Sequence, residues 1–134
     1  EAQPVPWTRT FPHALVSPSG EPDAQFVSTW ERSPWSDAYL TDLALHLLAS
    51  RKLGTTARTD MLAISLPALD LVGHAFGPRS HEVQDVLARI DVLLGRLLDA
   101  VERQVGRGRF VVALTSDHGV APVPEQVVAA GEDG

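Results

Sequence analysis

The sequence contains no cysteine. Disulfide bonds, thiolate zinc sites and cysteine nucleophiles are therefore excluded, and cysteine usage says nothing about the compartment. Long apolar runs are also absent, since none approaches the roughly 20 residues that a membrane-spanning helix needs. Residues 1–4 (EAQP) open with an acid rather than with the basic and then apolar order of a signal peptide, although a signal on a longer precursor would lie outside this sequence. We therefore expect no membrane segment in this chain.

Basic residues are scarce and nowhere form a run. The chain carries 17 acidic and 11 basic side chains, which gives a formal net charge of −6. Nucleic acid polymers and anionic membranes are held chiefly by Lys and Arg, so the charge argues against both as partners. With 134 residues, 44% of them hydrophobic and 21% charged, the chain is expected to form one globular domain at most.

Two regions differ in their sequence patterns. Residues 1–34 are rich in Pro, Ser and Thr and lack sustained periodicity, which predicts an irregular extended segment with one short strand at residues 25–30. From Ser36 onwards, Leu and Ala recur at steps of three and four residues. This pattern predicts a helix with Ser36 or Asp37 as its N-cap and Gly54 as its stop.

Residues 35–134 are predicted to form an α/β core. Two short apolar runs, residues 61–66 (MLAISL) and 110–115 (FVVALT), lack polar alternation, as is typical of strands buried on both faces of a parallel sheet. Between them an apolar stripe predicts a long helix with Ser80 as N-cap and Gly106 or Gly108 as a stop. The stripe consists of Val83, Val86, Leu87, Ile90, Leu94, Leu97, Leu98 and Val101. A strand–helix–strand unit makes its strands parallel, so both carboxyl ends open on the edge where such sheets bind ligands.

Two pairs of acidic and imidazole side chains follow these predicted strands. Asp70 and His74 are four residues apart, so one helical turn would place them on the same side. Asp117 and His118 are adjacent, and a tight turn at Gly119 would let both reach one site. Each pair alone is more often a hydrogen-bonded surface pair or a helix cap than a set of ligands. Their shared edge favours a metal site, and two carboxylates with two imidazoles suit zinc, although manganese or iron would also accept them.

These motifs also carry a family resemblance. Residues 70–78 (DLVGHAFGP), a long helix and then residues 114–119 (LTSDHG) resemble the metal-binding half of the alkaline phosphatase superfamily. The likeness is greatest to its type I phosphodiesterase and nucleotide pyrophosphatase branch, which includes phosphate-irrepressible alkaline phosphatases. The resemblance implies an alkaline phosphatase-like layered α/β fold with a largely parallel sheet, of which residues 1–134 form a single partial domain.

The resemblance also implies a chemistry. In this superfamily two zinc ions flank a phosphate ester, and a Thr or Ser alkoxide attacks phosphorus. Asp70 and His74 would bind the zinc that activates the hydrolytic water, and Asp117 and His118 the zinc that activates the nucleophile. The family's nucleophile, a further Asp and a later His have no counterpart here, so we expect a fragment of a dizinc phosphohydrolase that is inactive alone and completed by flanking segments of the same polypeptide.

Several alternatives stay open at this stage. A non-catalytic interaction or regulatory module could retain an alkaline phosphatase-like fold without the activity. A sulfatase or a cofactor-independent phosphoglycerate mutase is a more distant possibility, and a preference for mono- or diesters is not set by the four residues. The family also implies a periplasmic or extracellular location for the parent protein.

The remaining candidates have simpler structural interpretations. His46 and His81 are expected to be exposed or capping residues, and Arg79 to be solvated. Thr115 and Ser116 directly precede Asp117 and match a structural part of the motif, so neither is assigned as a nucleophile. Three tryptophans are expected to pack loops onto the core, namely Trp7, Trp30 and Trp35. Three glycines are expected to relax the backbone near the site, namely Gly73, Gly77 and Gly119.

Overall fold

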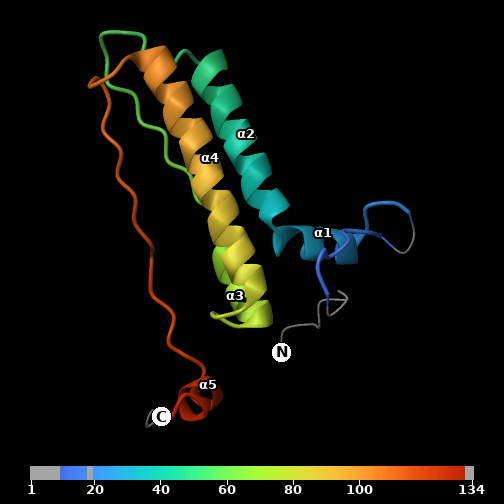
Figure 1. The fold of residues 1–134 in the computed structure, drawn as a ribbon. Helices are drawn as coiled ribbons and strands as arrows, with labels where there is room; N and C mark the ends of the chain where they lie inside the picture. The colour runs from blue at the N-terminus through green and yellow to red at the C-terminus, as the bar shows by residue number, and fades with distance from the viewer. Residues whose placement is uncertain (1–9, 18–19, 132–134) are drawn as a thin grey trace.

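The structure, a computed structural model, describes residues 10–17 and 20–131. These residues form helices joined by loops and two long extended segments (Figure 1). None of the described helices is long and apolar enough to cross a bilayer. The helices, in chain order, are α1 (Ala24–Glu31), α2 (Pro34–Ser50), α3 (Ala68–Phe76), α4 (His81–Val105) and α5 (Pro124–Ala129).

Helices α2 and α4 lie side by side and run in the same direction (Figure 1). Arg96 of α4 forms an ion pair with Asp42 of α2 at 2.7 Å. Two turns further on, the side chain of Gln104 donates hydrogen bonds to the carbonyl oxygens of Leu48, at 2.7 Å, and Leu53, at 2.8 Å. Because the contacts advance together along both helices, the pair is parallel, as expected for helices that each return the chain to the start of a strand.

Helix α4 confirms the predicted long helix. The hydroxyl of Ser80 accepts a hydrogen bond from the backbone N–H of Val83 at 3.2 Å and caps the first turn. At the other end Gly106 takes a φ of 96°, and its N–H donates to the carbonyl of Glu102. Such a φ suits glycine because it has no Cβ, so the glycine ends the helix.

Helix α2 begins earlier than predicted. Its N-cap position is Ser33, and Pro34 occupies the first helical position, where a missing N–H costs nothing. Ser36 and Asp37, the predicted caps, therefore lie within the first turn. After the helix the chain turns at Gly54, whose φ is 72°. A Cβ at this position would lie only 2.6 Å from a methyl carbon of Val105, so a side chain would not fit there.

The strand predicted at residues 25–30 is wrong, because this stretch is helix α1. The carboxylate of Asp23 accepts a hydrogen bond from the N–H of Phe26 at 2.8 Å and starts the helix. The buried hydroxyl of Thr29 donates to the carbonyl of Gln25 one turn back. Aromatic and β-branched residues favoured a strand, but a local cap and burial against the following helix outweigh this modest preference.

The hydrophobic core lies where α3 packs on the first turns of α4. Each fully buried aliphatic side chain contributes about 1.5–3 kcal/mol relative to exposure. The core consists of Ala68, Val72, Val83 and Val86, with Leu69, Phe76 and Ile90 packed against it. Ala44, Leu48, Leu93 and Val105 are also buried.

The predicted parallel sheet is not present among the described residues. Residues 61–66 and 110–115 are both extended and run in the same direction, toward the α3 end, as parallel strands would (Figure 1). Within the described chain neither makes a backbone hydrogen bond, and Met61 and Val111 are 89% and 95% exposed. A strand requires a neighbour for its N–H and C=O groups, and residues 10–17 and 20–131 supply none to these segments.

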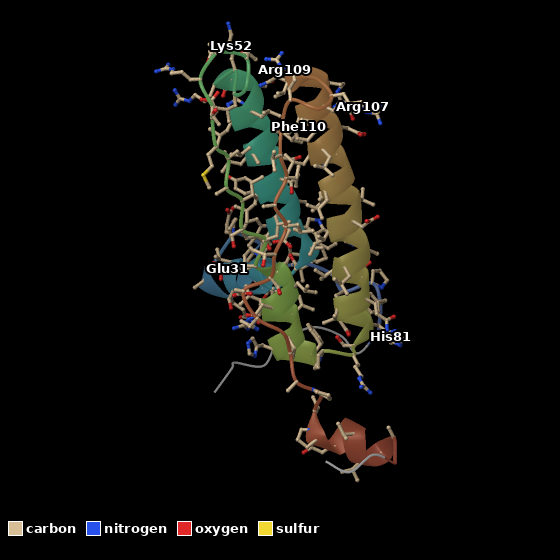
Figure 2. The ribbon with its side chains drawn as sticks, turned by 90° about the vertical axis from the view of Figure 1, so that its left-hand side faces the viewer. Glu31, Lys52, His81, Arg107, Arg109 and Phe110 are labelled. Atoms are coloured by element: carbon tan, nitrogen blue, oxygen red, sulfur yellow. The ribbon has the colours of Figure 1, made fainter. Side chains whose placement is uncertain are left out.

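An open, largely apolar groove of about 1750 Å³ separates the extended segments from α4. The second segment begins at Phe110, next to Arg109, and this end of the helix pair lies opposite to the end that carries His81 (Figure 2). The groove continues to the four residues predicted to bind metal. Much of the predicted α4 stripe faces this groove rather than a closed core. The apolar lining includes Leu62, Ile64, Leu94, Leu98, Val112 and Leu114.

Candidate functional site

Asp70 and His74 share one face of helix α3. Asp70 lies in the first turn and His74 in the last, and the distance between Asp70 Oδ1 and His74 Nε2 is 3.4 Å. This confirms that one helical turn brings the carboxylate and the imidazole together. Gly77 ends the helix with a φ of 91°. Both side chains are exposed enough for a ligand to reach them.

Asp117 and His118 lie in the loop that follows the second extended segment. The N–H of His118 donates to Asp117 Oδ1 at 3.1 Å, which folds the carboxylate back toward its neighbour. His118 Nε2 lies 3.7 Å from Asp117 Oδ2. The two adjacent side chains therefore lie on the same side of the backbone, as the turn interpretation predicted.

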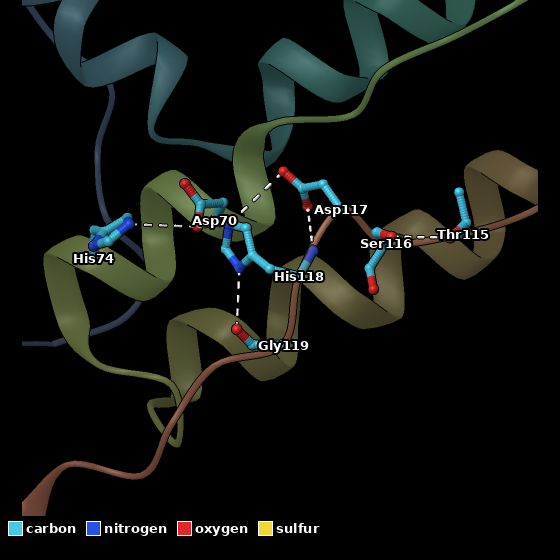
Figure 3. Close-up of polar contacts among 7 residues, drawn as sticks. All are labelled: Asp70, His74, Thr115, Ser116, Asp117, His118 and Gly119. Atoms are coloured by element: carbon cyan, nitrogen blue, oxygen red, sulfur yellow. Dashed lines mark hydrogen bonds and ion pairs between the residues drawn. The ribbon is translucent and has the colours of Figure 1, made fainter.

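The two pairs meet at Asp70 and His118. His118 Nε2 lies 3.8 Å from Asp70 Oδ1, the oxygen that also contacts His74 (Figure 3). The four side chains form a row in the order His74, Asp70, His118, Asp117. The structure therefore brings together residues from two distant motifs, as expected at the shared end of two parallel segments.

The hydrogen bond of His118 Nδ1 determines which ring nitrogen carries the proton. Nδ1 lies 3.0 Å from the carbonyl oxygen of Gly119, which can only accept, so Nδ1 carries the proton. In the neutral ring Nε2 then presents a lone pair toward the carboxylates of Asp70 and Asp117. The Gly119 hydrogen bond, followed by the charges of Asp117 and Asp70, raises the pKa of His118 above its ordinary value.

The donor set fits metal ions held by pairs of ligands. Two carboxylates and two imidazoles are the oxygen and nitrogen donors that zinc takes. Within the described part of the chain, no group of three or more His, Asp or Glu side chains is arranged to hold one ion together. Each pair supplies two donors, fewer than the four that zinc usually takes.

The other candidate residues have structural surroundings. His46, His81 and Arg79 are exposed. Arg89 lies over the ring of Trp35 at 5.2 Å, and Trp30 meets Tyr39 edge-on at 5.8 Å. The Thr115 hydroxyl donates to the Ser116 carbonyl. Gly73 and Gly119 show neither a positive φ nor a close neighbour. Trp7 lies outside the described residues.

Sequence reasoning missed a polar contact beneath the end of α3. His13 is mostly buried, and its Nε2 lies 3.0 Å from a carboxylate oxygen of Glu82 in the first turn of α4. Its ring stacks on Phe76 at 5.8 Å and lies 4.7 Å from the ring of Phe11. The contact ties the N-terminal segment to α3 and α4. No local signal in the sequence pairs residues so far apart.

Comparison with known proteins identifies relatives of the whole region. The family model for type I phosphodiesterase / nucleotide pyrophosphatase matches residues 5–133. The chain is 34% identical over 127 residues to alkaline phosphatase PhoV of Synechococcus elongatus, which covers 92% of this chain and 23% of that protein. It is 32% identical over 114 residues to alkaline phosphatase PafA of Elizabethkingia meningoseptica, covering 85% of this chain and 20% of that protein.

A third relative is alkaline phosphatase PhoD of Zymomonas mobilis, 35% identical over 103 residues, which cover 77% of this chain and 18% of that protein. The chain thus spans about a fifth of the length of these curated relatives. No solved structure matches it significantly. The family model covers nearly all of the sequence, including both acidic and imidazole pairs. The chain belongs to the type I phosphodiesterase/nucleotide pyrophosphatase family.

Proposed function

We propose that this chain is part of a metal-dependent hydrolase that cleaves phosphate mono- or diesters. The observation that carries the proposal is the approach of His118 to Asp70, which joins two motifs of a phosphohydrolase family at 3.8 Å. Relatives named as alkaline phosphatases support the class of reaction. Zinc is the expected metal, with manganese or iron as the other candidates.

Each ligand pair would hold one of two ions. Asp70 and His74, on one face of α3, would hold the first ion, and Asp117 and His118, in their loop, would hold the second. Bound zinc supplies positive charge that polarises a phosphoryl oxygen and lowers the pKa of a bound hydroxyl group or water. The carbonyl of Gly119 holds His118 in the tautomer whose Nε2 can bind a metal. The helical spacing of Asp70 and His74 keeps their donor atoms on one side.

The remainder of the active site belongs, in this proposal, to chain outside residues 1–134. The relatives are about five times as long, which leaves room for a Thr or Ser nucleophile and the missing ligands. The same flanking chain would pair with residues 61–66 and 110–115 and complete a parallel sheet over the groove. The isolated chain would then be inactive, and the parent protein would act in the periplasm or outside the cell.

Activity of the complete protein tests the proposal. We expect the zinc-loaded protein to hydrolyse p-nitrophenyl phosphate or bis-p-nitrophenyl phosphate, to lose this activity with a chelator and to regain it with zinc. Residues 1–134 alone should show none. Asp42→Asn, which removes an exposed carboxylate from α2, should leave activity unchanged. A complete protein that is inactive toward both substrates would instead support a non-catalytic module, and one that keeps its activity after chelation would refute the metal dependence.

A further inference from the structure

Asp37 is a buried acid on the helix that precedes the candidate site. It lies in the first turn of α2 and is 0% exposed. Its Oδ1 accepts a hydrogen bond from the backbone N–H of Ala68 at 3.2 Å. Ala68 is the first residue of α3, so an acid that the sequence suggested as a cap for α2 instead serves another helix.

Helix α3 depends on this contact because its own N-cap position has no suitable side chain. Pro67 occupies that position and makes no side-chain cap hydrogen bond. The first N–H groups of a helix have no partner within the helix and need an acceptor. Ala68 is itself 0% exposed, so water does not serve its N–H. A carboxylate at this end also matches the positive end of the helix dipole.

The second oxygen of Asp37 suggests a role beyond stability. Oδ2 is buried and has no hydrogen-bond partner among the described residues. Burial raises the pKa of Asp37, and the hydrogen bond from Ala68 only partly opposes this. Burying a carboxylate with half of its hydrogen-bonding capacity unused is costly, so the residue is poorly explained as a simple packing element.

We propose that Asp37 is a positioning residue of the metal centre, which fixes the start of α3 and thereby the directions of Asp70 and His74. The inference rests on the proposed function. Asp70 lies only two residues beyond Ala68, on a helix of nine residues. A shift of the first turn would therefore move the carboxylate of Asp70 relative to His118. Among the described residues, no hydrogen bond or ion pair joins Asp37 to the four proposed ligands.

Zinc affinity of the complete protein tests this role, measured by competition with a chromophoric chelator. Asp37→Ala removes the acceptor and should weaken zinc binding about 10-fold, the lower end of the range for direct partners of metal ligands, because Asp37 acts through the backbone of α3. Asp37→Asn keeps the acceptor oxygen and should stay within about threefold of the wild type, because binding depends on the hydrogen bond and not on the charge. Hydrogen exchange of the Ala68 amide should accelerate in Asp37→Ala only.

A matched control is Gln104 of α4, which contacts the chain at the other end of α2. Gln104→Ala removes two hydrogen bonds to the carbonyls of Leu48 and Leu53 and should lower thermal stability without changing zinc affinity. Should Asp37→Ala not fold, Asp37→Ser, whose hydroxyl is too short to reach Ala68, takes its place. The proposal is overturned if the folded Asp37 variant binds zinc like the wild type, if Asp37→Asn loses as much affinity as Asp37→Ala, or if Gln104→Ala loses as much.

The same experiment separates this inference from the function on which it rests. A wild-type protein that binds neither zinc nor manganese nor iron would refute the proposed function and the positioning role together. Zinc binding that needs Asp70 but is indifferent to Asp37 would refute the positioning role alone. Zinc binding that needs both, with faster exchange at Ala68 in the Asp37 variant, would support both.

Discussion

Asp70 Oδ1 lies 3.8 Å from His118 Nε2, although the two residues are separated by the whole of α4. Asp70 is placed by α3, which packs on the first turns of α4. His118 is placed by the chain that leaves the far end of α4 and runs back beside it (Figure 1). The contact therefore shows that the chain, after passing along α4 and back, returns to the end of the helix pair where α3 lies.

The first prediction concerns Asp70. We expect Asp70→Asn in the complete protein to weaken zinc binding by more than about 100-fold, because loss of an outer partner alone costs 10- to 100-fold and Asp70 is a proposed ligand. Hydrolysis of p-nitrophenyl phosphate should fall in parallel. Isothermal titration with zinc measures the first effect. An Asp70→Asn protein with wild-type zinc affinity would remove Asp70 from the site.

The second prediction compares two valines on α4. Val86 is 1% exposed within the core, whereas Val92 is 61% exposed. Val86→Ala should lower the free energy of unfolding by about 2 kcal/mol, from the lost burial of two methyl groups and the cavity left behind. Val92→Ala should change it by less than about 0.5 kcal/mol. Urea denaturation of the 134-residue chain measures both, and equal losses would contradict the packing of α3 on α4.

The third prediction concerns Glu82 and pH. Burial acts to raise the pKa of Glu82, but the hydrogen bond with His13, a backbone hydrogen bond and nearby imidazoles outweigh it, so the pKa lies below its ordinary value of 4.5. A lowered pKa stabilises the folded state above pH 4.5, and this contribution is lost as pH falls through the folded pKa. Glu82→Gln should therefore be less stable than the wild type at pH 7 and should approach it near pH 3.

Unfolding curves in urea between pH 7 and pH 3 measure this difference. We expect at most about 1 kcal/mol at pH 7, the range of partly solvated ion pairs. Glu31→Gln removes an exposed carboxylate from α1 and serves as the control, with little change at any pH. A Glu82→Gln deficit that is constant with pH would show that packing, rather than the charge, is responsible.

The fourth prediction concerns the extended segments in the isolated chain. Exposed segments with unpaired N–H and C=O groups and apolar side chains are templates for pairing with other chains. We expect residues 1–134 to self-associate and Val111→Lys to reduce this, because Val111 lies in the second segment and is almost fully exposed. Sedimentation velocity measures the association. Val92→Lys, on α4 outside the groove, should not reduce it, and an equal reduction would exclude the segment as the contact.

Local patterns in the sequence predicted the features that local physics controls. Helix α4 follows its apolar stripe and its Ser80 cap, and the spacing of Asp70 and His74 requires only one helical turn. The approach of the two motifs followed from the rule that a crossover helix returns the chain to the same edge. For residues 25–30, however, aromatic and β-branched residues favour a strand, whereas the Asp23 cap starts helix α1.

Other features depend on partners that no local pattern identifies. The contacts of His13 with Glu82 and of Asp37 with Ala68 join residues far apart in the chain, so only the folded chain selects them. The segments at residues 61–66 and 110–115 carry the apolar pattern of buried strands, yet within the described residues they lack neighbours and do not form a sheet. A strand is a property of a pair of segments, whereas a helix satisfies its own backbone groups.

The sequence by itself therefore determined helix α4, the four candidate ligands and the family, because capping, helical periodicity and motif spacing act over a few residues or a single crossover. Only the tertiary structure decided the distance of 3.8 Å between Asp70 and His118 and the start of α3 from Asp37 of another helix. These contacts arise from packing between distant segments, which sets distances that spacing along the chain does not.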